Sequence, residues 1–268
     1  MSTTTVNGTT LHYEEVGQGP AALVLHGGLG LDHTFYRGLD VLADRLRLVY
    51  YDQRANGRSE RVPLETLTME QLADDAAALA TRLDATPAIV IGHSYGGFVA
   101  QELALRHPEH VAGLILLDTT PGQLGASDSP DDDQGPPPPP EWLAVAGSAP
   151  ATDAEFAATL GALLPHYLAD QANLAAAHEA VSKTIFDAAT MARSMEVLAG
   201  WSSVDRLAQI EVPTLVVVGS HDRITSPAQS HRIARRIPHA QVVEMEHSGH
   251  FPWLEEPERF TKIVREWL

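Results

Sequence analysis

A serine, an aspartate and a histidine in this chain each follow a short apolar run of the kind that forms a buried strand: Ser94, Asp222 and His250. A serine hydroxyl is a weak nucleophile until a base removes its proton, and an imidazole can do so near neutral pH. A carboxylate bound to the imidazole fixes its tautomer and stabilises the imidazolium. Because the carboxyl ends of parallel strands lie at one edge of a sheet, we expect the three side chains to meet there. The set predicts nucleophilic acyl transfer.

Ser94 is the central residue of the sequence Gly-His-Ser-Tyr-Gly, which follows the apolar run 89–91 and precedes a helical pattern over 98–106. A G-x-S-x-G motif between a strand and a helix holds its serine on a sharp turn with the hydroxyl exposed. The start of the helix would place backbone N–H groups and the positive end of the helix dipole beside a developing oxyanion. We therefore expect Ser94 to be the nucleophile.

Two competing residues stay open at this point. Asp118 also ends a predicted strand, 111–117, and is an alternative to Asp222 as the acid. His247 lies three residues before His250, and we expect it to support the loop.

Strand and helix patterns alternate on both sides of a long interruption, which predicts a parallel sheet with helices on both faces. Asn7-Gly8 predicts a hairpin turn within residues 3–15. Further strands are predicted at 21–25, 46–51, 111–117, 213–218 and 240–245, and helices at 35–46, 67–83, 98–106, 227–237 and 257–268, with Thr68 as an N-cap.

The interruption begins at residue 119 and runs to about residue 200. It contains an acidic and proline-rich stretch at 128–140, for which we expect an extended loop. Helical patterns follow at 141–146, 153–164, 168–183 and 188–198, with no strand pattern among them. We therefore predict an α/β core formed by residues 1–118 and 201–268, with a helical cap inserted at 119–200.

The composition limits the partners of the protein. A formal net charge of −17 in 268 residues argues against nucleic acid and anionic membrane surfaces. The absence of cysteine excludes disulfides and thiol catalysis. We expect a cytoplasmic protein with a small-molecule substrate, no membrane span, and no cofactor or metal, since the histidines lack metal-ligand spacing and no dinucleotide fingerprint is present. The sequence does not predict an oligomeric state.

Five segments of the chain carry recognisable motifs. They are His26-Gly27-Gly28-Leu29-Gly30, residues 52–59 (DQRANGRS), residues 92–96, residues 219–222 (GSHD) and residues 247–250 (HSGH). Together they resemble the α/β-hydrolase superfamily and, within it, the proline iminopeptidase-like branch. The resemblance implies Ser94 as nucleophile, His250 as base and Asp222 as acid, with an oxyanion hole formed by the backbone N–H groups of Gly28 and Tyr95.

The chain departs from the iminopeptidase pattern in three of these segments, at Leu29, at Ala55 and Asn56, and at His93 and Tyr95. An aminopeptidase also needs a carboxylate in the cap to bind the free amine of its substrate. The candidates for that carboxylate are Glu155, Asp170, Glu179, Asp187 and Glu196.

We therefore predict a serine hydrolase that acts on a small carboxylic ester, lactone or amide. Alternatives are a proline iminopeptidase-type aminopeptidase, a hydrolase of carbon–carbon bonds, and a non-catalytic binding protein of the same fold. Candidates for the substrate pocket are His26, Leu29, His93 and Phe251, of which we expect His26 to have a mainly structural role. Asp52 and Arg54 are expected to brace loops, and His33, His107 and His166 to be surface or structural residues.

Overall fold

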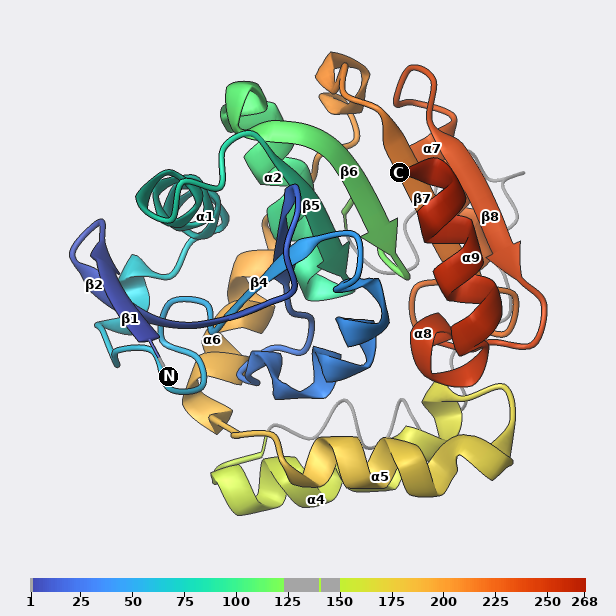
Figure 1. Ribbon diagram of the computed structural model, residues 1–268. Helices are drawn as coiled ribbons and strands as arrows, with labels where there is room; N and C mark the ends of the chain where they lie inside the picture. Colours follow the sequence, from blue (N-terminus) through green and yellow to red (C-terminus); the bar gives the residue numbers. More distant parts are fainter. Residues whose placement is uncertain (1, 123–139, 141–149) are drawn as a thin grey trace.

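The computed structural model describes residues 2–122, 140 and 150–268, and it contains one eight-stranded sheet in the order β1-β2-β4-β3-β5-β6-β7-β8 (Figure 1). The pairs from β4 to β8 are parallel, whereas β1 pairs with β2 and β2 with β4 in antiparallel fashion. The strands are β1 Ser2–Val6, β2 Thr9–Val16, β3 Ala21–Leu25, β4 Arg47–Tyr51, β5 Ala88–His93, β6 Val111–Leu117, β7 Thr214–Gly219 and β8 Gln241–Met245.

Helices cover both faces of the sheet, as predicted. In β3, Leu23 and Leu25 pack into a core shared with α1 and α2, whereas Ala22 and Val24 pack into a second core shared with α9. The α-helices are α1 Met69–Arg82, α2 Tyr95–Arg106, α4 Asp153–Leu163, α5 Leu174–Ser182, α6 Ala188–Ala199, α7 Pro227–Ala234, α8 Pro252–Glu255 and α9 Pro257–Trp267.

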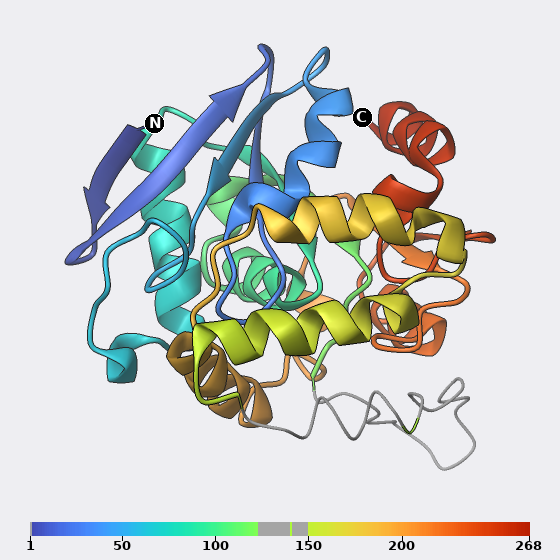
Figure 2. The same ribbon diagram turned by 90° about the horizontal axis from the view of Figure 1, so that it is seen from below.

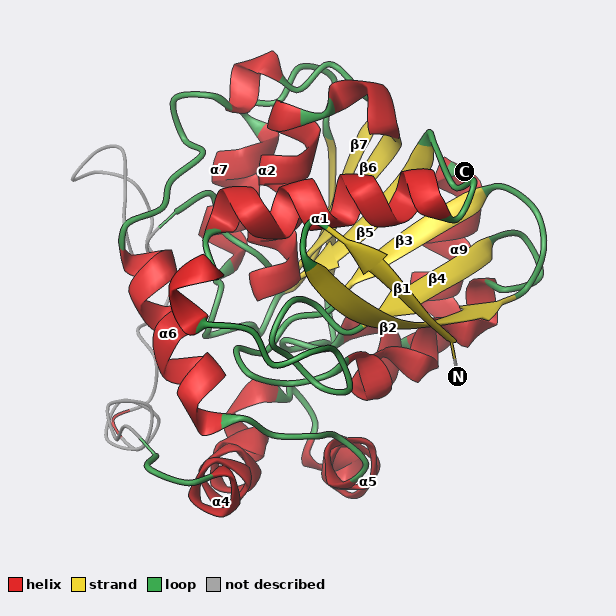
Figure 3. Ribbon diagram, turned by 90° about the vertical axis from the view of Figure 1, so that its left-hand side faces the viewer, coloured by secondary structure: helices red, strands yellow, loops and turns green. Residues whose placement is uncertain are grey.

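The hairpin of β1 and β2 lies at one end of the sheet (Figure 3). Its turn is the predicted Asn7-Gly8 pair, and both residues have positive φ angles of 43° and 74°. Such angles are those of the tight turn that matches the twist of two antiparallel strands, so this local signal was sufficient to predict the hairpin.

Two predicted helices differ from the structure. Residues 35–46 were expected to form an α-helix, but the segment is a 3-10 helix, η1 His33–Leu42, that starts where the Asp32 carboxylate accepts from the Thr34 N–H. The predicted helix 168–183 is interrupted because Asp170 caps a separate 3-10 turn, and α5 begins only at Leu174. In both cases a carboxylate accepts from the N–H group two residues later in the chain and starts a tighter turn.

Residues 150–200 contain helices and no strand in the part that the structure describes. Helices α4, α5 and α6, here called the inserted helices, connect β6 to β7. Figures 1 and 2 show α4 and α5 lying across the end of the molecule toward which β6 and β8 point. The predicted helix 141–146 and, apart from Pro140, the predicted loop 128–140 lie outside the described residues. Among the described helices, none has the length and apolar character that spanning a bilayer requires.

A buried ion pair ties the hairpin to α1. Arg54 Nε lies 2.7 Å from Asp75 Oδ2, and both side chains are almost fully buried. Arg54 Nη2 also donates to the Asn7 carbonyl at 3.0 Å, and Asn7 Nδ2 donates to Asp75 Oδ1 at 3.0 Å. The expectation that Arg54 braces loops is confirmed, since it joins the hairpin turn, its own loop and α1.

We predict that Arg54→Leu lowers the free energy of unfolding by roughly 3–5 kcal/mol, because the Asp75 carboxylate stays buried without its cation. Urea unfolding of both proteins measures the change. The control is Arg106→Leu, which breaks the half-exposed pair with Asp74 and should cost at most about 1 kcal/mol. Equal losses in the two variants would contradict a special role for the buried pair.

Candidate active site

Ser94 lies on a strained turn between β5 and α2, with φ 49° and ψ −117°. Its carbonyl accepts from the Gly97 N–H at 2.9 Å and from Thr119 Oγ1 at 2.8 Å. A Cβ atom at Gly96 would overlap the Leu25 carbonyl oxygen, so the helix can approach β3 this closely only with glycine there. The surroundings therefore hold Ser94 in a conformation that it would not adopt alone.

Asp222 and His250 meet as predicted at the carboxyl edge of the sheet. His250 Nδ1 lies 2.9 Å from Asp222 Oδ2, and both residues are buried. His250 and Ser94 line the same cavity. The three residues expected to act together therefore come from three different strand ends to one place.

Further hydrogen bonds hold the Asp222 carboxylate. Its Oδ1 accepts from the N–H groups of Ile224 and Thr225 at 2.8 and 3.1 Å, and its Oδ2 accepts from Thr225 Oγ1 at 2.6 Å. Burial by itself would raise the pKa of Asp222, but His250 and these donors outweigh burial and lower the pKa to about 2. The carboxylate therefore stays ionised beside the imidazole.

Asp118, the competing acid, lies close to both residues but makes a different contact. Its Oδ1 accepts from the Gly219 N–H at 2.9 Å. Donor atoms of Asp118, Asp222 and His250 all lie within 4.8 Å of one another. Burial, followed by the negative charge of Asp222, raises the pKa of Asp118 well above its usual value. Asp222, not Asp118, is thus the carboxylate that bonds the imidazole of His250.

Gly28 and Tyr95, the expected oxyanion-hole residues, both line the cavity that Ser94 reaches. Gly28 has φ 72°, a conformation that favours glycine, and its N–H donates to no group in the part of the chain that the structure describes. Tyr95 is the first residue of α2, so its N–H has no acceptor within the helix. Two backbone N–H groups without an acceptor among the described residues therefore belong to residues that line the cavity with Ser94.

The cavity has a volume of about 210 Å³ and lies between the strand ends and the inserted helices. Leu29, His93 and Phe251 line it, as expected. The inserted segment and its neighbours contribute mostly apolar side chains, which are Pro150, Phe156, Thr159, Leu160, Leu163, Leu164, Tyr167, Val181, Thr184, Met191, Met195 and Leu198.

His26 does not line the cavity, which corrects its assignment as a pocket candidate. The side chain is fully buried, with Nδ1 3.1 Å from the Gly27 carbonyl and Nε2 accepting from the Gln53 N–H at 3.1 Å. Gln53 Nε2 in turn donates to the His26 carbonyl at 2.8 Å. His26 therefore braces the Gly28 loop against residues 52–59, the structural role expected for it.

A chain of hydrogen bonds beneath the site was not predicted. The Gly27 N–H donates to the Tyr36 hydroxyl at 2.7 Å, and that hydroxyl lies 2.7 Å from His93 Nδ1. His93 Nε2 lies 2.9 Å from the His250 carbonyl. Tyr36 lies in η1 and gives no local sequence signal for this role. Only the fold reveals that it links the loop of Gly28 to the loop of His250.

The inserted helices contact both of these loops. The Asp187 N–H, at the start of α6, donates to the Gly30 carbonyl at 2.8 Å. The His250 N–H donates to the Tyr167 carbonyl at 2.7 Å. Glu255 accepts from the Gly249 N–H through one oxygen and from the Ala169 N–H through the other. Residues 150–200 therefore help to hold the loops that carry Gly28 and His250 in place.

Comparisons with known proteins identify the family to which the chain is similar. Residues 20–257 match the model of a family described as alpha/beta hydrolase fold. The chain is 28% identical to a protein named proline iminopeptidase PfmaB, from Pestalotiopsis fici, over 98% of this chain and 97% of that protein.

Two solved structures are similar to the chain over nearly its whole length. A thermophilic esterase from Thermogutta terrifontis has 30% identity and a TM-score of 0.78, with 99% of this chain and 95% of that chain covered. The enol-lactonase from Burkholderia xenovorans LB400 has 27% identity and a TM-score of 0.80, with 99% of each chain covered.

We predict that Tyr36→Phe destabilises the protein by about 1–3 kcal/mol, because the buried Gly27 N–H loses its acceptor and His93 loses its donor. Guanidinium unfolding measures the effect. Tyr50→Phe is the matched control, since it frees only the partly exposed Asp40 carboxylate. An unfolding curve of Tyr36→Phe that coincides with that of the wild type would refute the linking role of the hydroxyl.

The raised pKa of Asp118 predicts a pH-dependent difference in stability. The folded state keeps a proton that the unfolded chain releases above about pH 4, so this contribution is complete below that pH and is lost as the pH rises. Asp118→Asn does not titrate, so its stability relative to the wild type should increase as the pH rises above 4.

Thermal unfolding at several pH values between about 5.5 and about 8 tests this difference. Glu102→Gln is the control: burial by itself would raise the pKa of Glu102, but its bonds to Arg206 and Trp201 outweigh burial and lower the pKa, so its contribution is lost only below this range. Its difference from the wild type should stay constant across the measured range. A constant difference for Asp118→Asn as well would exclude a neutral buried Asp118.

Proposed function

The chain belongs to the alpha/beta hydrolase fold family and is a hydrolase, and from that premise we propose that it cleaves a small, uncharged carboxylic ester or lactone by acyl transfer through Ser94. His250 is the general base and then the general acid, and Asp222 orients it. The backbone N–H groups of Gly28 and Tyr95 form the oxyanion hole.

The proposed reaction balances without a redox partner. His250 takes the hydroxyl proton of Ser94 as the oxygen attacks the carbonyl carbon, and Gly28 and Tyr95 stabilise the oxyanion. His250 then protonates the leaving oxygen, and an acyl-enzyme remains. Water, deprotonated by the same imidazole, displaces Ser94 and gives the acid. The hydrogen bond of 2.9 Å from His250 Nδ1 to Asp222 supports this assignment, because it leaves Nε2 for the hydroxyl.

The single observation that carries the choice of substrate is the lining of the cavity. Among the described residues, those that line it include no aspartate, glutamate, lysine or arginine. A charged group on the substrate would lose its hydration there without gaining a partner of opposite charge, at a cost of several kcal/mol in general. An uncharged acyl group of modest size instead finds aliphatic and aromatic side chains such as Leu29, Leu160 and Phe251.

The aminopeptidase alternative needs a carboxylate for the substrate amine, and the five candidates lie elsewhere. None of them is among the residues that line the cavity. Glu179 pairs with Lys183, Glu196 with Arg193, and Asp187 with Arg61, while Glu155 and Asp170 accept from backbone N–H groups in their own turns. Esterase or lactonase activity is therefore favoured over aminopeptidase activity.

We also propose that the inserted helices act as the cap that was expected at 119–200. The support for this role is that α4 and α6 contribute Phe156 and Met191 to the wall of the cavity that Ser94 also lines. Met195 lines the same cavity and is 46% exposed, so it lies where the cavity approaches the surface.

We predict that p-nitrophenyl butyrate is hydrolysed and that proline p-nitroanilide is not. The mono-p-nitrophenyl ester of succinic acid, which carries a carboxylate, should have a kcat/KM about 100-fold lower than the butyrate ester because its charge is unpaired in the cavity. Steady-state kinetics with both esters, the anilide and a simple lactone measure these differences.

Ser94→Ala and Asp222→Asn identify the turnover that belongs to this site. Each should lower kcat by about 10³-fold or more while the protein stays folded by circular dichroism. Preferred turnover of the anilide, lost in Ser94→Ala, would replace the proposal with an aminopeptidase. Turnover that survives in Ser94→Ala would remove Ser94 from the mechanism.

A further inference from the structure

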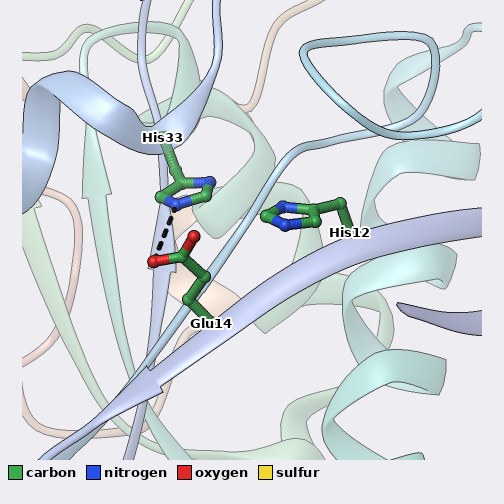
Figure 4. A group of neighbouring side chains, drawn as sticks. All are labelled: His12, Glu14 and His33. Atoms are coloured by element: carbon green, nitrogen blue, oxygen red, sulfur yellow. Dashed lines mark ion pairs between the residues drawn. The ribbon is translucent and has the colours of Figure 1, made fainter. Parts of the chain in front are cut away.

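His12, Glu14 and His33 point toward one another at the side of the sheet formed by β2 (Figure 4). Each offers one donor atom, and these atoms lie within 4.8 Å of one another. We propose that this group, here called the β2 site, binds a divalent transition metal ion of the zinc type. Two imidazoles and one carboxylate are a ligand set that zinc and its neighbours accept, with the fourth position open to water.

The fold, not the spacing along the chain, creates the β2 site. His12 and Glu14 are two residues apart on β2 and therefore share one face of the strand. His33 opens η1, and its ring stacks beside that of His12 with centroids 5.6 Å apart. No short motif contains these residues, which is why the sequence led us to expect no metal site.

The buried imidazole of His12, which has no hydrogen bond among the described residues, is the first evidence that the group is a binding site. The residue is 3% exposed, and neither ring nitrogen has a hydrogen-bond partner among the described residues. The nearest carboxylate oxygen, Asp52 Oδ2, lies 3.5 Å from Nδ1 without hydrogen-bond geometry. Buried polar atoms are almost always paired, so an imidazole left in this state beside two further donor groups indicates a missing partner.

Asp52 provides the second piece of evidence. Its Oδ1 accepts from His33 Nδ1 at 2.5 Å and from the His33 backbone N–H at 3.1 Å. A proton on Nδ1 leaves the lone pair of Nε2 free, and Nε2 is the atom that faces Glu14, 3.9 Å from Oε2. Imidazoles that bind metals typically donate their other N–H to a carboxylate in this manner, which orients the ring and strengthens the ligand.

Glu14 is the most exposed of the three residues, with about one third of its side chain exposed. Arg37 Nη1 lies 3.0 Å from Glu14 Oε2, so a bound ion would share this carboxylate with Arg37 or displace it. Bonds of about 2.0–2.1 Å to zinc bring its ligands closer together than the donor atoms now lie, so binding draws the three side chains inward. The side chain of Glu14 can make this movement because it is about one third exposed.

Two other groups of donor atoms in the described structure are already engaged. Asp222 and His250 bond to each other in the candidate active site. His107 Nε2 bonds to Asp74 at 2.7 Å, and His110 Nδ1 bonds to Glu109 at 3.1 Å on the surface. Of the three groups, the β2 site alone has a buried imidazole without a hydrogen bond.

An ion in the β2 site would join β2 to the first residue of η1. That residue follows directly on the loop 26–32, which carries Gly28. The proposal concerns metal binding and stability and does not depend on the proposed hydrolytic function.

The test uses the full-length protein, freed of metal by chelation and dialysis, and titrates it with Co²⁺. Co²⁺ at a four-coordinate site of nitrogen and oxygen ligands gives a strong visible absorption, and Zn²⁺ displaces it. We expect one equivalent of Co²⁺ to produce this band in the wild type. Glu14→Gln and His12→Asn should weaken Co²⁺ binding by about 100-fold.

Matched controls separate the β2 site from the other groups. Glu15→Gln changes the next residue of the same strand, whose carboxylate pairs with Arg47. His107→Asn changes the surface group formed by His107, Glu109 and His110. Both should keep the band. Since Glu14 is partly exposed, Glu14→Gln remains decisive even where His12→Asn fails to fold.

The absence of a Co²⁺ band in the wild type would overturn the proposal. A band that Glu14→Gln leaves unchanged would overturn it as well, and so would a band that disappears in His250→Asn or His107→Asn instead. A rise in the melting temperature with Zn²⁺ in the wild type, absent in Glu14→Gln, would provide independent support.

Discussion

The hydrogen bond from His93 to the His250 carbonyl decides which group donates in the hydrogen bonds that Tyr36 makes with His93 and Gly27. A carbonyl only accepts, so His93 Nε2 must carry the proton and Nδ1 must accept. The Tyr36 hydroxyl then has to donate to Nδ1, and its oxygen is left to accept from Gly27. Burial, together with the neighbouring His250, lowers the pKa of His93 well below its usual value, so a second ring proton does not break this order. Two loops distant in the sequence are thereby held in one relative position.

Much of the fold follows from local signals. The Asn7-Gly8 turn, the Thr68 cap and the apolar runs predict the hairpin, the start of α1 and the order of strands and helices, and the family match confirms the α/β-hydrolase resemblance. The meeting of Asp222 with His250, and the cavity shared by His250 and Ser94, could be predicted because each of the three residues follows a strand. The linking role of Tyr36 and the raised pKa of Asp118 could not be predicted, since both depend on contacts between distant segments. The prediction of an α-helix at 35–46 was wrong. The Asp32 carboxylate accepts from the Thr34 N–H, and a 3-10 helix starts there instead.

Charged and apolar side chains lie on different sides of the candidate active site. The buried carboxylates of Asp52, Asp75 and Asp222 each accept hydrogen bonds from several donors. Asp118 has a backbone donor, but burial and the nearby Asp222 carboxylate raise its pKa well above its usual value. The wall of the cavity has no such group among the described residues. Polar groups such as His250 and Asp222 therefore come to the site from the strand ends, whereas the inserted helices contribute mostly apolar side chains to the cavity.

This one-sided cavity also bears on the end of the proposed catalytic cycle. A neutral ester that enters leaves its acyl part behind as a carboxylic acid, which ionises near neutral pH. The product anion would then lie in a pocket whose described lining offers it no lysine or arginine. Holding it there would be unfavourable for the same reason that admitting a charged substrate would be. The wall proposed to select the substrate would therefore also favour release of the product.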